Sequence, residues 1–197
     1  MDEMPSPTDV AGMRVAALVS DNFEQVELTG PRQALEAAGA KVTLVSTHEG
    51  SVQGMRHDIK ADVFPVELMM AGAQADQFDA VLLPGGVMNG DELRLSEAAR
   101  RFVTAMQVSG KPMFVICHGA WLLVSAGLVA GRTLTSWPSL KDDIHNAGGS
   151  WIDTEVAVDG KLVSSRKPDD LPAFNAAMLK VLAQSRMVVR PQSQSDG

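Results

Sequence analysis

The expected fold of this chain follows from one segment, Lys111-Pro112-Met113-Phe114-Val115-Ile116-Cys117-His118-Gly119. Its apolar part, residues 111–116, predicts a strand covered on both faces, because such strands are short continuous hydrophobic segments. The apolar segment 121–127 ends at a glycine and predicts a helix directly afterwards. Cys117 therefore falls on a sharp strand-to-helix turn, where a reactive side chain is exposed and often strained, as in a nucleophile elbow.

The cysteine on this turn is a candidate nucleophile. Unpaired N–H groups and the dipole at a helix N-terminus favour an anion, so the position predicts a thiol pKa below the ~8.5 of free cysteine. His118 adds an adjacent base. The competing interpretation is an inert core residue, since free cysteine is among the most often buried residue types. Partners for the thiol elsewhere in the chain are needed to separate the two.

The composition is ordinary for a soluble globular protein. The chain has 197 residues, of which 45% are hydrophobic and 21% charged, which fits one domain with a large core. A net charge of −7 argues against nucleic acid or an anionic membrane as the main partner. One cysteine excludes an internal disulfide framework, and no apolar run reaches the ~20 residues that span a bilayer. With an N-terminal segment unlike a signal peptide, we expect a cytoplasmic protein.

Predicted strands and helices alternate along the chain. Buried strands are expected at 14–20, 41–46, 78–83 and 111–116. A first helix is expected after the turn at 21–22, carrying Leu28 and Leu35 and stopping at Gly39, and further helices at 96–109, 121–127, 141–147 and 169–184. The segments 52–55 and 59–63 predict short edge strands, and 155–164 predicts a hairpin turning at Asp159-Gly160. This order predicts a layered α/β domain over 13–184 with parallel strands and right-handed crossovers, and flexible tails at 1–12 and 185–197.

Three polar or glycine-rich turns follow the predicted strands: residues 21–27, residues 84–86 and the turn at Cys117. Ligands bind at the carboxyl ends of the strands in such sheets. A carboxylate from Glu24 or Glu27 can then hydrogen-bond the sulfur, and the N–H groups of Gly86 and His118 can form an oxyanion hole.

Four motifs in this order resemble the ThiJ/PfpI superfamily, and most closely its intracellular protease I (PfpI-like) branch. They are Phe23-Glu24-Gln25-Val26-Glu27-Leu28-Thr29-Gly30-Pro31, Leu82-Leu83-Pro84-Gly85-Gly86, Ile116-Cys117-His118-Gly119 and Arg166-Lys167-Pro168-Asp169-Asp170-Leu171-Pro172-Ala173-Phe174-Asn175. The resemblance covers about residues 13–184. It implies a three-layer flavodoxin-like sandwich with a mostly parallel central sheet, similar to class I glutamine amidotransferases. It also implies assembly as a homodimer or homohexamer.

The resemblance also implies roles for single residues. Cys117 matches the family nucleophile and His118 the adjacent histidine. Glu27 matches the carboxyl group that contacts the thiol, and Glu24 matches a second acidic position.

A further acidic residue is implied from a neighbouring subunit. In the protease a glutamate there completes a triad, and the matching position holds Asp91, which is one methylene shorter, with Glu92 as the alternative. Trp121, Ser136 and Trp137 are expected to border the substrate pocket, although core packing is an equally good explanation for each tryptophan.

Activities described for the superfamily all use this thiol: peptidase, glyoxalase, deglycase and oxidation sensing. We therefore expect a stress-related cysteine-dependent enzyme, in which Cys117 attacks a small reactive carbonyl, a glycation adduct or a peptide carbonyl. The alternative is a redox-sensing stress protein with little turnover, whose Cys117 is oxidised to sulfinic acid. No metal or other cofactor is expected, because the remaining histidines lack ligand spacing and no phosphate-loop pattern follows the first strand.

Overall fold

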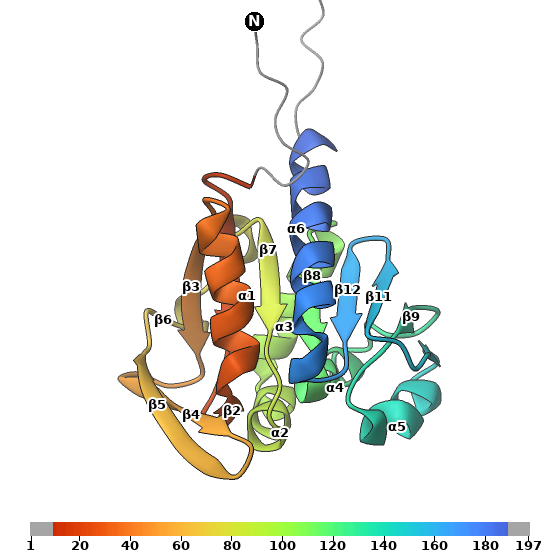
Figure 1. Ribbon diagram of the computed structural model, residues 1–197, viewed down its shortest axis with the longest axis horizontal. Coiled ribbons are helices and arrows are strands. Elements are labelled where there is room, and N and C mark those ends of the chain that lie inside the picture. The colour runs from red at the N-terminus through yellow and green to blue at the C-terminus, as the bar shows by residue number, and fades with distance from the viewer. Residues whose placement is uncertain (1–9, 189–197) are drawn as a thin grey trace, which may run out of the picture.

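A computed structural model describes residues 10–188, in which helices cover both faces of a central sheet (Figure 1). The sheet has seven strands in the spatial order β11 (Val156–Asp159), β12 (Leu162–Ser165), β8 (Met113–Ile116), β7 (Ala80–Leu83), β1 (Arg14–Leu18), β3 (Lys41–Ser46) and β6 (Leu68–Met69). All neighbours pair in parallel except β11, which is antiparallel to β12. The predicted α/β sandwich with a mostly parallel sheet is confirmed.

Two apolar cores lie on the two faces of this sheet. Helices α1 (Gln25–Ala37) and α6 (Leu171–Val188) cover one face, and α3 (Glu97–Val108) and α4 (Ala120–Ser125) cover the other. Strand β1 contributes side chains to both cores, because successive side chains of a strand point to opposite faces of the sheet. Its residues 15 and 17 belong to the first core, and residues 16 and 18 to the second. All four residues of β8 are buried, as predicted for the strand before Cys117.

Two smaller sheets flank the central one. The predicted edge strands form β4 (Ser51–Arg56) and β5 (Ile59–Pro65), an antiparallel pair that joins β2 (Phe23–Glu24) in a sheet of its own. Strands β9 (Thr133–Leu134) and β10 (Ser150–Trp151) pair beside α5 (Lys141–Asn146). The β4–β5 hairpin lies at the carboxyl-end edge of the central sheet, at the lower left of Figure 1.

Local signals placed several elements correctly. Ser96 Oγ accepts the N–H of Ala99 at 3.2 Å and caps α3, as expected from its position. The β11–β12 hairpin turns at the predicted place, where Gly160 takes a positive φ of 58°. Among the described residues, no helix has the length and apolar character needed to cross a membrane.

Other elements differ from the sequence expectations. Helix α2 (Val87–Leu95) is not predicted, because its sequence has a glycine and an asparagine in its middle and little amphipathic pattern. Helix α1 begins at Gln25, inside the helical stretch that is expected between the turn at residues 21–22 and Gly39. Helix α6 runs on to Val188, past the predicted end near 184. Of the expected tails, residues 1–9 and 189–197 lie outside the described residues.

Candidate active site

Cys117 lies on a strained turn between β8 and α4. Its φ is +61°, a left-handed conformation that non-glycine residues rarely adopt. A 3-10 turn over Cys117–Gly119 joins the strand to the helix. Gly119 fits there because a β-carbon at this position would overlap the Leu83 carbonyl oxygen. The nucleophile-elbow geometry expected from the sequence is therefore present.

Glu27 is the acidic partner of the thiol. Its side chain is completely buried in the first turn of α1, and Oε2 accepts the Gly85 N–H at 2.8 Å. The carboxyl group also interacts with the Cys117 thiol. Both groups press against the α-carbon of Gly85, where a β-carbon would overlap Glu27 Oε2 and lie 3.0 Å from Cys117 Sγ. Of the two glutamates considered from the sequence, Glu27 is the one in contact with the sulfur.

Burial governs the protonation of this pair. Loss of solvation, followed by the negative charge of Glu24, raises the pKa of Glu27 to about 8, although the Gly85 N–H opposes the shift. Burial and the charge of Glu27 also raise the pKa of Cys117 well above its ordinary value. The expectation of a depressed thiol pKa is therefore wrong, because desolvation outweighs the helix terminus and the nearby amides. The pair holds its protons to higher pH than two exposed groups would.

Two main-chain amides point at the sulfur. The N–H groups of Gly86 and His118 donate to Cys117 and favour its thiolate. Gly86 supplies its N–H from a φ of +96°, and a β-carbon there would lie 2.8 Å from the Asn22 oxygen and the Glu24 nitrogen. These are the two donors that the sequence interpretation assigned to an oxyanion hole.

His118 turns back toward the cysteine. Its Nδ1 lies 3.2 Å from Cys117 Sγ. The ring lies edge-on to Trp121, with centroids 5.0 Å apart, and stacks on Trp137 at 5.9 Å. Burial lowers the pKa of His118 to about 4, so the imidazole is neutral near pH 7. A neutral imidazole beside a thiol can accept or relay a proton.

A cavity of about 480 Å³ opens beside Cys117 and His118. Its remaining wall residues are Asn22, Glu24, Glu27, Met55, His57, Asp58, Gly86, Val87, Met88, Trp137 and Pro168. A second hollow of about 400 Å³ adjoins it and shares four of these residues, Glu24, Met55, His57 and Pro168. Glu24 therefore lies on the cavity wall, where its Oε2 accepts the His57 N–H at 3.0 Å. No Lys or Arg lines the larger cavity.

The three expected pocket residues take different positions. Trp137 lies on the cavity wall and is 39% exposed. Trp121 lies behind His118, where its Nε1 donates to Asp143 Oδ2 at 2.8 Å. Ser136 is buried, donates to the Trp137 carbonyl and accepts from Trp151 Nε1 at 3.0 Å. The structure thus places Trp121 and Ser136 outside the wall itself, where Asp143 and Trp151 bond to their polar atoms.

Residues from the β4–β5 hairpin and the start of α2 complete the wall, and the sequence interpretation did not include them. They are Met55, His57, Asp58, Val87 and Met88. No local signal marks them, since the way this hairpin folds over the elbow depends on its pairing with β2.

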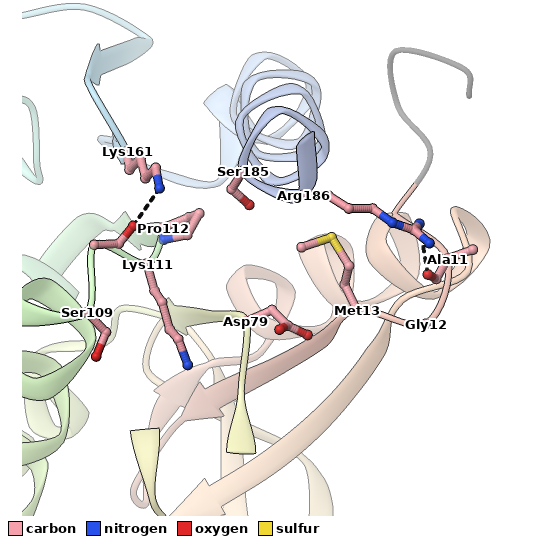
Figure 2. Close-up of a pocket in the computed structure, with 11 residues that line it drawn as sticks. Ala11, Gly12, Met13, Asp79, Ser109, Lys111, Pro112, Lys161, Ser185 and Arg186 are labelled. Atoms are coloured by element: carbon pink, nitrogen blue, oxygen red, sulfur yellow. Dashed lines mark hydrogen bonds between the residues drawn. The ribbon is translucent and has the colours of Figure 1, made fainter. Parts of the chain in front are cut away.

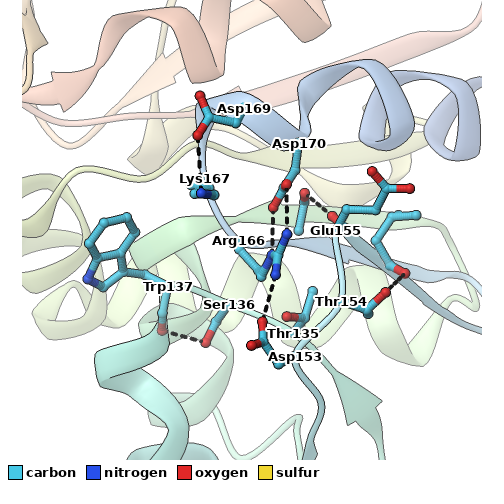
Figure 3. A network of polar contacts seen from close by, with 12 residues as sticks. Thr135, Ser136, Trp137, Asp153, Thr154, Glu155, Arg166, Lys167, Asp169 and Asp170 are labelled. Atoms are coloured by element: carbon cyan, nitrogen blue, oxygen red, sulfur yellow. Dashed lines mark hydrogen bonds and ion pairs between the residues drawn. The ribbon is translucent and has the colours of Figure 1, made fainter.

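A charged network holds the loop that carries Pro168 (Figure 3). Arg166 donates through Nε and Nη2 to the two oxygens of Asp170 at 2.8 and 3.0 Å, and through Nη1 to Asp153 at 2.7 Å. Asp170 is only 5% exposed, so this bidentate pair fixes the loop firmly. The fourth sequence motif therefore acts here as a support for the pocket wall.

Asp91 and Glu92 lie on α2, and both are exposed. Neither lines the cavity. Glu92 Oε1 accepts from Thr47 Oγ1 at 2.9 Å. A role for Asp91 or Glu92 toward a neighbouring subunit stays a prediction, since it requires a second copy of the chain.

Another cavity, of about 350 Å³, lies at the opposite edge of the sheet (Figure 2). Lys161 donates there to the Gly110 carbonyl at 2.6 Å, and Lys111 donates to the Ala75 and Phe78 carbonyls at 2.7 and 2.6 Å. Asp79 accepts the Arg14 N–H at 2.7 Å. Its wall includes no cysteine or histidine. This cavity therefore lacks a Cys–His or Ser–His pair. Among the described residues, no group of three or more His, Cys, Asp or Glu side chains is arranged to hold a metal ion.

Comparison with known proteins agrees with this geometry. A deglycase of Pyrococcus abyssi is 42% identical over 170 residues, which cover 86% of this chain and 99% of that protein. Protein/nucleic acid deglycase 2 of Escherichia coli is 39% identical over 171 residues, covering 86% and 97%. The crystal structure of Drosophila melanogaster DJ-1beta has a TM-score of 0.77 at 25% identity and covers 91% of this chain and all of that one. The DJ-1/PfpI family profile matches residues 13–181. The chain belongs to the DJ-1/PfpI family.

Proposed function

We propose that this protein is a cysteine-dependent enzyme that removes reactive dicarbonyl groups, either as free aldehydes or as adducts on amines, with Cys117 as the nucleophile. The observation that carries the proposal is the meeting of a strained cysteine, a buried carboxyl group and two main-chain amides at one end of a cavity. A nucleophile, a proton acceptor and donors for developing negative charge are the parts that addition to a carbonyl requires.

The first step forms a bond between sulfur and carbon. Cys117 Sγ adds to the aldehyde carbon, the thiol proton passes to ionised Glu27, and Glu27 returns it to the former carbonyl oxygen. The product is a hemithioacetal. With a hemiaminal adduct, formation of the same S–C bond breaks the C–N bond, and the amine leaves with the thiol proton. A carboxyl group with a pKa of about 8 suits this exchange near neutral pH.

The second step releases the acid. A proton moves from the hemithioacetal carbon to the neighbouring carbonyl carbon, and the hemithioacetal hydroxyl proton moves to the oxygen of that carbonyl. The hemithioacetal carbon thereby becomes the C=O of a thioester, and its neighbour carries the new hydroxyl group. Water then adds to the thioester carbonyl, the S–C bond breaks, and a 2-hydroxy acid leaves as the thiol regains its proton. His118, neutral and 3.2 Å from the sulfur through Nδ1, is the second group placed to carry a proton.

Two features of the cavity support adducts as substrates. Its volume, together with the adjoining hollow, leaves room for a carrier larger than a three-carbon aldehyde. The wall of the larger cavity carries Glu24 and Asp58 and no Lys or Arg, and the adjoining hollow adds Arg56. The part of the carrier nearest Cys117 therefore meets negative charge, which suits a neutral or cationic group such as an amino-acid side chain. The relatives from Pyrococcus abyssi and Escherichia coli, both named deglycases, support the same assignment.

Peptide hydrolysis is the second candidate. The adjoining hollow would take the residues of an extended chain. The buried His118 ring, however, already packs between two tryptophans, and Asp91 and Glu92 of the same chain are outside the cavity. A peptidase triad therefore depends on assembly as a homo-oligomer. Dicarbonyl removal needs only residues within one subunit.

Wild type and Cys117→Ala, incubated with methylglyoxal and with methylglyoxal-treated N-acetylarginine, test the proposal. We expect wild type to consume both substrates with formation of lactate, and the variant to lose this activity at least a hundredfold. A variant that keeps the wild-type rate would overturn the proposal. Wild type that lacks turnover but gains two oxygens at Cys117 at a low peroxide dose would favour the redox-sensing alternative. A fluorescent peptide in a parallel assay reports peptidase activity.

A further inference from the structure

Asn89 is a buried polar residue that the catalytic steps above do not use. It lies in α2, its side chain is completely buried, and it makes three hydrogen bonds. Its Oδ1 accepts the Ser20 N–H at 2.7 Å, and its Nδ2 donates to the Pro84 and Gly85 carbonyls at 3.0 Å each. A buried amide is costly unless such bonds are made, so an apolar residue would be the simpler choice at this helix position.

The three bonds end on segments that build the site. The Pro84 and Gly85 carbonyls belong to the turn at residues 84–86. The peptide N–H groups joined to these two carbonyls act on the catalytic pair: the Gly85 N–H donates to Glu27, and the Gly86 N–H points at the sulfur. Ser20 follows β1, at the start of the segment that leads to Glu24 and Glu27. The Asn89 side chain therefore connects the segment that leads to Glu27 with the turn that carries the Gly86 amide, and both of these groups are partners of Cys117.

The turn at residues 84–86 needs an external support. Gly85 and Gly86 must be glycines, because β-carbons there would meet Glu27 and Cys117 at one position and the backbone of Phe23 at the other. Two consecutive glycines have wide conformational freedom and no side chains with which to hold their own position. Besides the Asn89 bonds, the Gly85 carbonyl accepts only the Glu24 N–H among the described residues, at 3.2 Å. Asn89 is the side chain that holds this turn in place, through hydrogen bonds to its Pro84 and Gly85 carbonyls.

We propose that Asn89 is a positioning residue, which holds the Gly85 and Gly86 amides against Glu27 and Cys117 and so sets the reactivity of the thiol. Its effect on turnover rests on the proposed function. Its effect on the thiol does not, because the reactivity of Cys117 can be measured without any substrate.

Alkylation of the single cysteine by iodoacetamide tests this inference across pH 6–10 in wild type, Asn89→Ser and Asn89→Ala. Both substitutions are neutral and too short to reach the two carbonyls. In both variants we expect alkylation of Cys117 at pH 7.5 to be at least tenfold slower than in wild type. The inflection of the rate–pH curve should move upward by about one pH unit, because the Gly86 and Gly85 N–H donors are no longer aligned with the thiolate and with Glu27. The kcat/KM for methylglyoxal should fall in parallel.

Leu93→Ala is the matched control. Leu93 lies one turn further along α2, is 1% exposed and packs in the second core. Its truncation should lower the denaturant midpoint while the alkylation profile stays as in wild type. A wild-type alkylation profile in folded Asn89→Ser, or an equal shift in Leu93→Ala, would overturn the inference.

Hydrogen exchange of the wild-type protein gives an answer even if both Asn89 variants fail to fold. The two Asn89 side-chain protons should exchange slowly, as expected for buried bonded donors, and exchange at the rate of an exposed asparagine amide would overturn the inference. If wild type lacks turnover but the alkylation profile of Asn89→Ser shifts, the positioning role stands and the proposed function fails.

Discussion

The carboxyl group of Glu27 and the sulfur of Cys117 lie against the same α-carbon, that of Gly85. The Gly85 N–H donates to Glu27 Oε2 at 2.8 Å, and the next amide, that of Gly86, is directed at the sulfur. The two glycines therefore bring the acid and the nucleophile together in a space that no side chain can enter. The chemistry of the pair depends on this exclusion.

The pH dependence of catalysis should follow the Glu27–Cys117 pair. The reactive state is the one in which the pair has lost one proton, so kcat/KM for methylglyoxal should rise with pH to an inflection near 8. In Glu27→Gln the amide cannot ionise, and the thiol must lose its proton unaided. We expect the Gln variant to lose about 100- to 1000-fold in kcat/KM at pH 7.5, with its inflection moved upward. A Gln variant with the wild-type profile would contradict this.

The stability of the protein should also report the ionisation of Glu27. Its pKa is raised from 4.5 to about 8 in the folded state, so between these values the folded protein holds a proton that the unfolded chain has released. Stability is therefore fully present below pH 4.5 and falls as the pH rises toward 8. Between pH 6.5 and 8 the loss from Glu27 should be about 2 kcal/mol. His118 is neutral in the folded state and half protonated at pH 6.5 in the unfolded chain, so it offsets only a few tenths of a kcal/mol of this loss, on the order of 0.4.

Urea denaturation of wild type and Glu27→Gln at pH 6.5, 7.0, 7.5 and 8.0 measures this slope. The Gln variant carries no titrating group at position 27, so its free energy of unfolding should stay nearly constant over the same range. Parallel slopes in the two proteins would show that Glu27 is not the titrating group.

Gly85→Ala should disable the site with little effect elsewhere. The added β-carbon would overlap Glu27 Oε2 and lie 2.6 Å from Cys117 Cβ, so either the carboxyl group or the elbow must move. We expect at least a hundredfold loss of kcat/KM and a loss of ~1–3 kcal/mol in stability from overpacking. Gly72→Ala is the matched control, because its β-carbon would meet only Leu68 Cδ1, at 3.7 Å. Its activity should equal that of wild type.

Arg166→Lys should loosen the pocket wall without removing a reacting group. Lysine cannot reproduce the bidentate bond to Asp170, so the loop carrying Pro168 should become less well fixed. We expect KM to rise several-fold while kcat changes less than twofold, together with a loss of ~1–3 kcal/mol in stability. Arg101→Lys, in an exposed ion pair with Glu97, should change stability by under ~0.5 kcal/mol and leave KM unchanged. A fall in kcat alone for Arg166→Lys would contradict the prediction.

Residue patterns were enough to predict the layered α/β fold, the turn that carries Cys117, and the convergence of Gly86, His118 and an acidic residue, Glu24 or Glu27, on one site. These follow from continuous apolar strands, turn residues and the rule that carboxyl ends of parallel strands share an edge. Tertiary structure alone decided the rest. Which glutamate meets the sulfur depends on where α1 begins, and the depth of burial reversed the expected shift of the thiol pKa. The positions of the β4–β5 hairpin and α2 over the cavity have no local signal, because they come from contacts between segments far apart in the chain.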